Sequence, residues 1–184
     1  MKVRQYQDID GCWNALFNER VWRMEDEVED ESLFGKCDGV AEALYGRNGL
    51  LDPQGVARFR MVWNSRLIDA LNAMDVELVM TSTWRQDSLA VIELMGVTHE
   101  NPRILHPKSG FSEFPSIYWK YEAIIAEQQR DPSPFIWIDD EIVDLPAPAK
   151  QRILSLGGLM ICPDAQFGMT PKQVAMMNEY IASH

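Results

Sequence analysis

From residue 56 onward, apolar residues follow two alternating patterns. Short, mainly apolar runs predict buried strands at 76–80, 135–138 and 159–162, with a brief strand at 103–105. Apolar positions spaced three and four residues apart predict helices at 56–75, 88–95, 116–129, 148–156 and 171–181. Strands and helices that alternate in this way are typical of a parallel sheet buried on both faces. The pattern therefore predicts an α/β protein with a three-layer α/β/α, Rossmann-like fold and a central, mostly parallel sheet.

The first 58 residues do not follow this pattern. Residues 2–7 predict a strand, but only Val3 and Tyr6 are strand formers, which favours a displaced or edge-exposed position. Residues 15–58 contain six acids within 25–31, followed by several glycines. We interpret 15–58 as a small, cap-like insertion, solvated and rich in loops, within a single domain of 184 residues. Loops that follow a first strand can cover a site.

Charge and composition restrict the class of partner. The formal net charge of −11 argues against an extensive nucleic-acid-binding surface and against anionic membranes. Neither a run of about 18 apolar residues nor a signal-peptide pattern is present, so we expect a cytoplasmic protein with no membrane partner. Three cysteines and three histidines are scattered along the chain, which makes a disulfide framework or a zinc site improbable.

Polar clusters follow three of the expected strands. Asp8-Ile9-Asp10-Gly11 ends the first strand, Thr81-Ser82-Thr83 follows the second, and Asp139-Asp140 follows 135–138. Taken alone, each is more commonly a turn, a cap or a helix start. In open parallel sheets, however, sites lie beyond the carboxyl ends of the strands. The three clusters are therefore expected at one edge of the sheet.

Four carboxylates at one edge would repel one another unless a cation lay among them. Oxygen ligands without histidine or thiolate favour Mg²⁺, which binds through a few carboxylates and a substrate phosphate. A hydroxyl and a lysine from the intervening helix could hold the remaining phosphate oxygens. Such a set of groups suits phosphoryl transfer to an aspartate.

The order Asp-x-Asp-Gly, strand-Ser/Thr, helical Lys, strand-Asp-Asp resembles the haloacid dehalogenase (HAD) superfamily. More narrowly, segments 8–14, 78–84 and 135–140 resemble the small HAD domains of phage and actinobacterial proteins, including those linked to RNA-repair (Swiss Army Knife) proteins. Segment 159–170 is similar to the end of those domains. The likeness covers most of 1–14 and 56–184 but not the insertion.

The resemblance implies a role for each acid. Asp8 would be the nucleophile, and Asp10 the general acid/base that protonates the leaving oxygen and later activates water. Mg²⁺ would be held by Asp8 and by the main-chain carbonyl of Asp10, joined by Asp139 or Asp140.

The resemblance also implies a hydroxyl and a lysine at the site. The hydroxyl is best assigned to Ser82, with Thr81 and Thr83 as close alternatives. Lys120 matches the lysine, with Lys108 as the alternative. The candidate substrate-binding residues are Thr81, Thr83, Arg85 and Lys108.

These residues predict a Mg²⁺-dependent phosphohydrolase, a HAD-type phosphatase, that acts through an aspartyl-phosphate. Its partner would be a phosphorylated small molecule or a nucleic-acid end. Two alternatives stay open: a metal-dependent nuclease, because clustered acids also serve two-metal phosphodiester cleavage, and a non-catalytic HAD-like protein that binds a phosphorylated ligand. The sequence does not identify the substrate.

Overall fold

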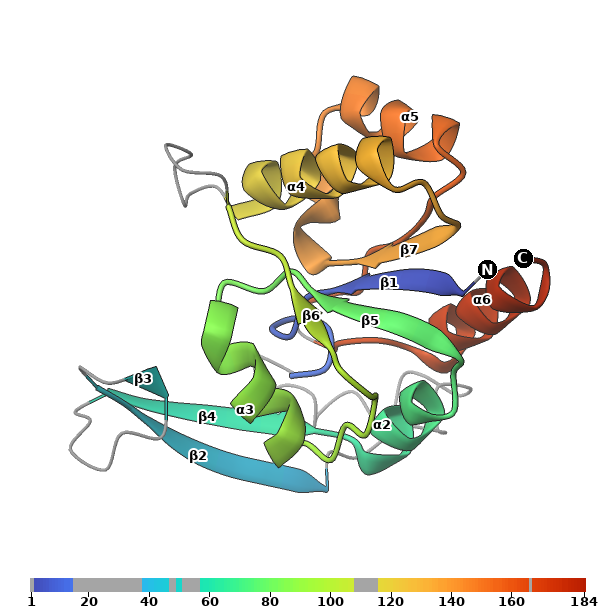
Figure 1. Ribbon diagram of the computed structural model, residues 1–184. Coiled ribbons are helices and arrows are strands. Elements are labelled where there is room, and N and C mark those ends of the chain that lie inside the picture. The colour runs from blue at the N-terminus through green and yellow to red at the C-terminus, as the bar shows by residue number, and fades with distance from the viewer. Residues whose placement is uncertain (1, 15–37, 47–48, 51–56, 108–115, 166) are drawn as a thin grey trace.

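The computed structural model describes residues 2–14, 38–46, 49–50, 57–107, 116–165 and 167–184. Five parallel strands form its central sheet (Figure 1). The strands are β1 (Val3–Gln7), β5 (Val76–Met80), β6 (Arg103–Ile104), β7 (Phe135–Ile138) and β8 (Leu159–Ile161). Their order across the sheet is β6-β5-β1-β7-β8, and every neighbouring pair is parallel. This confirms the α/β class and the parallel sheet, whose strand order is Rossmann-like.

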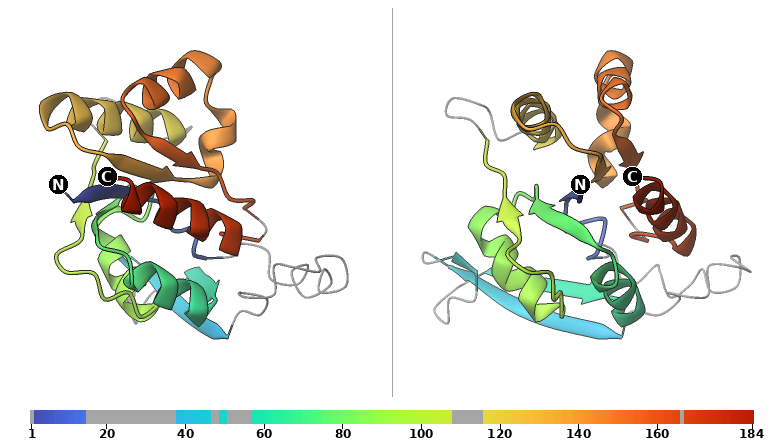
Figure 2. Two further views of the ribbon diagram at one scale, coloured as in Figure 1. Left: turned by 90° about the vertical axis from the view of Figure 1, so that its right-hand side faces the viewer. Right: turned by 45° about the vertical axis from the view of Figure 1, so that its right-hand side comes forward.

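Helices cover both faces of the sheet (Figures 1 and 2). On one face lie α4 (Ser116–Arg130) and α5 (Ala147–Ser155), whose apolar residues share a core with Tyr6, Val79 and Trp137. The other face is covered by α2 (Ser65–Asn72), α3 (Ser88–Leu94) and α6 (Pro171–Ala182). The alternating side-chain directions of each strand supply apolar residues to both cores. Short 3₁₀ helices, Arg85–Asp87 and Asp140–Asp144, follow the ends of β5 and β7.

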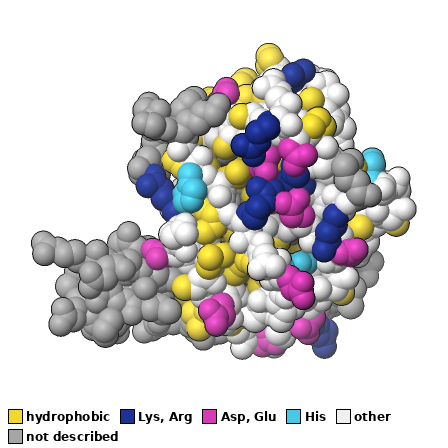
Figure 3. Space-filling view, viewed as in Figure 1, with side chains coloured by type: hydrophobic (Ala, Val, Ile, Leu, Met, Phe, Trp, Pro, Cys, Tyr) yellow, Lys and Arg dark blue, Asp and Glu magenta, His cyan; other side chains and the backbone are white. Residues whose placement is uncertain are grey.

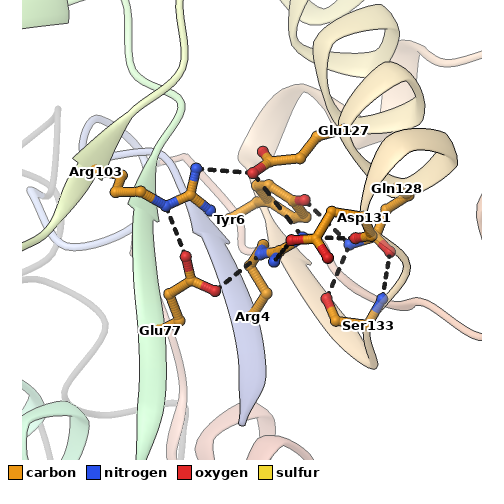
Figure 4. A network of polar contacts seen from close by, with 8 residues as sticks. All are labelled: Arg4, Tyr6, Glu77, Arg103, Glu127, Gln128, Asp131 and Ser133. Carbon is orange, nitrogen blue, oxygen red and sulfur yellow. Dashed lines mark hydrogen bonds and ion pairs between the residues drawn. The ribbon is translucent and has the colours of Figure 1, made fainter. Parts of the chain in front are cut away.

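The polar strand β1 lies at the centre of the sheet, which corrects the prediction of a displaced or edge-exposed strand. All five of its residues are buried between β5 and β7. Its polar side chains are tolerated there because Arg4, Gln5 and Gln7 all donate hydrogen bonds within the protein. Gln5 Nε2 donates to Gln7 Oε1 at 3.0 Å on one face of the sheet. On the other face, Arg4 joins a larger network (Figure 4).

Three acids surround the Arg4 guanidinium: Glu77 of β5, Glu127 of α4, and Asp131, which directly follows α4. Arg4 Nε donates to Glu77 Oε2 at 3.0 Å, and Arg4 Nη2 donates to Asp131 Oδ2 at 2.8 Å. Arg103 of β6 donates to the other Glu77 oxygen at 2.6 Å and pairs with Glu127 of α4 at 2.7 Å. The network links the sheet to α4, the helix that also carries Lys120.

Replacing Arg4 by methionine is expected to lower the free energy of unfolding by about 2 kcal/mol, measured by urea denaturation. Among the described residues, the change leaves Arg103 as the cation paired with the buried Glu127 and with Glu77. Partial exposure of Glu77 and Asp131 reduces the cost. Lys2→Met is the control, since it removes the exposed Lys2–Asp75 pair and should change stability by less than about 0.5 kcal/mol. Equal losses in the two variants would contradict a stabilising network.

The prediction of a helix at 56–75 is wrong for the first half of that range. Ala57–Trp63 forms strand β4, and α2 begins only at Ser65. The sequence Ala-Arg-Phe-Arg-Met alternates with a period of two residues, which favours a strand over a helix. Asn64 then caps α2, because its side-chain oxygen accepts from the backbone N–H of Arg66 at 2.9 Å.

Strand β4 belongs to a small antiparallel sheet of order β3-β2-β4, formed with β2 (Gly39–Gly46) and β3 (Gly49–Leu50). This sheet lies beside α2 and α3 (Figures 1 and 2). Part of the expected insertion is therefore regular strand where loops were predicted. The acidic run at 25–31 lies outside the described residues. Among the described helices, none combines the length and apolar character that crossing a membrane requires.

Candidate active site

The order of the strands brings two predicted acids together at the carboxyl edge. The chain passes from β1 to β5 and β6, and α4 then leads back to β7 on the opposite side of β1. Ligand sites of open α/β sheets lie where the strand order reverses in this way. Asp8 and Asp139 follow β1 and β7 directly at this point. The Asp8 N–H donates to Ile138 O at 3.0 Å, which keeps the two strand ends in register.

Three carboxylates cluster at this edge. One oxygen each from Asp8, Asp139 and Asp140 lies within 4.8 Å of the others. Asp8 and Asp139 are buried, whereas Asp140 is partly exposed. Gly11 lets the turn after β1 approach them, since its φ is +67° and a Cβ there would lie 2.4 Å from Asp140 Cγ. This acidic triad could hold a metal ion.

Lys120, on α4, points its ammonium group into the acids. Its Nζ lies 2.6 Å from Asp8 Oδ2, 2.8 Å from Asp139 Oδ2 and 3.3 Å from Glu141 Oε2. Burial lowers the pKa of Lys120, but the charges of Asp8 and Asp139 and their hydrogen bonds outweigh it and raise that pKa well above its ordinary value. The structure thus places a buried cation between the ends of β1 and β7. Lys108, the alternative lysine, lies outside the described residues.

The triad carries more negative charge than Lys120 offsets. Burial raises the pKa of Asp139 to about 8, and the charge of Asp8 adds to the effect. Burial and Asp8 also raise the pKa of Asp140 to about 6. A divalent cation would relieve this cost, and three oxygen donors without nitrogen or sulfur suit a hard cation such as Mg²⁺.

These shifts predict a pH-dependent response to metal. An acid whose pKa is higher in the folded than in the unfolded protein lowers the free energy of unfolding as pH rises from its unfolded pKa to its folded pKa. Without metal, the Asp139 and Asp140 shifts should therefore lower stability from near pH 3.8 to about pH 8. Because metal binding requires ionised carboxylates, MgCl₂ should raise the melting temperature more at about pH 8 than at about pH 5. NaCl at matched ionic strength is the control, and equal Mg²⁺ shifts at both pH values would count against the site.

Asp10 lies outside the triad, and both of its oxygens accept hydrogen bonds. Asn14 Nδ2 donates to Oδ1 at 2.7 Å, and Trp84 Nε1 donates to Oδ2 at 2.8 Å. Burial raises the pKa of Asp10, whereas these two donors oppose the shift. Two residues after Asp8, the chain thus presents a second carboxylate in a fixed orientation. Metal binding by the main-chain carbonyl of Asp10 stays a prediction.

The three hydroxyl candidates differ in exposure. Thr81 and Ser82 are fully buried and Thr83 is exposed. The Thr81 N–H donates to Gln7 O at 2.8 Å, which puts this residue beside the end of β1. Its Oγ1 has no hydrogen-bond partner in the described part of the chain, whereas Ser82 Oγ accepts from Trp84 N at 3.4 Å. Both hydroxyls stay candidates. Arg85, partly exposed, follows with a φ of +53°.

Sequence reasoning gave no role to three residues that contact the site. Asn14 and Trp84 hold Asp10, and Glu141 contacts Lys120. Asn14 follows Asp10 by four positions, a spacing that could have indicated the contact within the turn. The Trp84 contact spans 74 residues, so no local pattern signals it.

Comparisons of this chain with protein-family models, curated proteins and solved structures find no match. The geometry of the site is therefore the basis for assigning a function.

Proposed function

We propose that this protein is a Mg²⁺-dependent phosphohydrolase of the HAD type that acts through an aspartyl-phosphate. One observation carries the proposal: a buried lysine bridges Asp8 and Asp139 at the switch point of the sheet. A carboxylate nucleophile, a cation and a second, separately held acid are the groups that phosphoryl transfer to an aspartate requires.

Asp8 is the nucleophile in this proposal. Its Oδ2 contacts Lys120, and its Oδ1 accepts from the backbone N–H of Ile9 at 2.7 Å, so the carboxylate is held from both sides. An Asp8 oxygen attacks phosphorus while the bond from phosphorus to the leaving oxygen breaks. Lys120 offsets the charge that develops on the transferring group.

Asp10 serves both halves of the reaction. It donates a proton to the leaving oxygen in the first half and takes a proton from the attacking water in the second. Water then displaces Asp8 from phosphorus, which releases phosphate and restores both carboxyl groups.

Asp8, Asp139 and Asp140 are the residues that would hold Mg²⁺, because they form the described acidic triad. When bound, the ion would supply positive charge that offsets the charge developing on the phosphoryl group. Thr81 and Ser82 are buried and directly follow β5, whose last residue, Met80, pairs with Gln7 at the end of β1. They are the proposed hydrogen-bond donors to the phosphoryl group.

The substrate class is a phosphorylated small molecule or a nucleic-acid phosphate end. On the face drawn in Figure 3, acidic and basic side chains are interspersed. The formal net charge of −11 fits a small phosphorylated group better than a long polyanion. A two-metal nuclease would use the same acids but would leave Lys120 and the held Asp10 without a role.

The test is hydrolysis of an aryl phosphate with MgCl₂, followed by trapping with beryllofluoride. We expect turnover that EDTA removes and added Mg²⁺ restores, together with a beryllofluoride adduct on Asp8. Turnover that survives EDTA would overturn the metal assignment, and phosphodiester cleavage without an adduct would favour the nuclease. Mg²⁺-dependent ligand binding without any turnover would favour a non-catalytic protein.

A further inference from the structure

The hydrogen bonds of Asp10 have only one possible direction. The Trp84 indole nitrogen is a donor and never an acceptor, so Asp10 Oδ2 must accept at this contact. Asn14 Oδ1 accepts from the backbone N–H of Val62 at 2.8 Å, which requires the amide nitrogen of Asn14 to face Asp10 Oδ1. The carboxyl group is therefore fixed at both oxygens.

The support of Asn14 comes from the small antiparallel sheet. Val62 of β4 pairs with Val40 of β2, and its N–H points away from β2 and donates to Asn14. The edge of β4 opposite β2 therefore faces the turn that carries Asp10. Asn14 and Val62 are both buried, and a buried amide with these two bonds has little freedom to rotate. Asn14 and Trp84 thus contact the carboxyl group directly, and β4 acts on it through Asn14.

We propose that Trp84 and Asn14 are positioning residues that aim the Asp10 carboxyl group at the leaving oxygen, with β4 holding Asn14 in place. The inference rests on the proposed function, in which Asp10 is the general acid. General acids contribute about 10²–10⁴-fold to rate, and displacement of a reacting group by about 1 Å costs on the order of 10²-fold. In this proposal the small antiparallel sheet helps to orient the catalytic acid, because Val62 of β4 holds Asn14 and Asn14 holds Asp10.

Leaving-group dependence separates this role from a structural one. A good leaving group such as dinitrophenolate needs no proton, whereas an alkoxide does, so only alkyl phosphates depend on a well-placed Asp10. The kcat/KM value reports the steps up to cleavage of that bond. The ratio of kcat/KM for an alkyl phosphate to kcat/KM for dinitrophenyl phosphate is thus the measured quantity.

We expect Trp84→Phe to lower kcat/KM for the alkyl phosphate by roughly 10–100-fold and for dinitrophenyl phosphate by less than about 3-fold. Asn14→Ala should show the same pattern, and thermal unfolding confirms that each variant is folded. Trp137→Phe is the control for removing an indole: Trp137 is buried and Trp84 is half-buried, but Trp137 Nε1 has no hydrogen-bond partner in the described part of the chain. Its ratio should equal that of the wild type.

Each outcome has a distinct meaning. An unchanged ratio in Trp84→Phe and Asn14→Ala, with an active wild-type protein, would overturn the positioning role and leave the phosphohydrolase intact. The same change of ratio in Trp137→Phe would also overturn it. A wild-type protein that hydrolyses neither substrate would overturn the proposed function and this inference together.

Discussion

Asp8→Asn is expected to lower the turnover of an aryl phosphate by at least about 1,000-fold, because the amide cannot attack phosphorus. The protein should still fold. Lys120 keeps Asp139 and Glu141 as partners, and the amide oxygen of the variant can accept the Ile9 N–H bond. Loss of one negative charge also reduces repulsion within the triad, so the melting temperature should be unchanged or higher.

Steady-state hydrolysis and thermal unfolding measure these two effects. Asp75→Asn is the matched control, since Asp75 is exposed and pairs only with Lys2 among the ion pairs of the described residues. Its turnover should equal that of the wild type. An Asp8→Asn variant that keeps more than about a tenth of wild-type turnover would exclude Asp8 as the nucleophile.

Local sequence pattern was sufficient for most of the parallel sheet. The run at 135–138 is apolar on both faces and the run at 76–80 is apolar except for Glu77, because helices cover both sides of these strands. Both strands formed as predicted. Thr170 and Gln173 form the capping box at the predicted start of α6. These features depend on residues close in sequence, so they can be predicted without knowledge of the tertiary contacts.

Two of the wrong expectations arose where contacts between distant residues, or a second periodicity in the sequence, determine the structure. β1 was judged too polar for a central strand because Glu77 and Asp131, the partners of Arg4, lie far along the chain. Within 56–75, apolar residues fit both a helical spacing and strict alternation, and pairing with β2 selected the strand.

For the candidate site, too, the sequence predicted which acids lie together but not every side-chain contact. Asp8, Asp139 and Asp140 were expected to lie together because each follows a strand, and the carboxyl ends of parallel strands lie at one edge of the sheet. Sequence left Lys120 and Lys108 as alternatives, and the structure brings Lys120 to the acids. The contacts of Trp84 and Glu141 depend on side-chain direction after a turn, which residue spacing does not determine.

Lys120→Met tests how far the acids depend on their buried cation. Methionine fits a similar volume but carries no charge, so Asp8 and Asp139 would stay buried without the ammonium group. Removing one partner of a buried ion pair typically costs about 3–5 kcal/mol, and we expect a loss of that size in the free energy of unfolding from urea denaturation. Lys150→Met is the control, because Lys150 donates at the surface to Val143 O and should contribute less than about 0.5 kcal/mol.

A second substitution tests whether Lys120→Met loses stability because the acids are left without a cation or because packing is disturbed. Asp139→Asn removes one of the unpaired charges, so the double variant Lys120→Met/Asp139→Asn should be more stable than Lys120→Met alone. MgCl₂ should also stabilise Lys120→Met if the triad still binds a cation, since the ion replaces part of the missing positive charge. A double variant as unstable as the sum of the single changes would mean that Lys120 acts through packing, because charge compensation requires the two residues to be coupled.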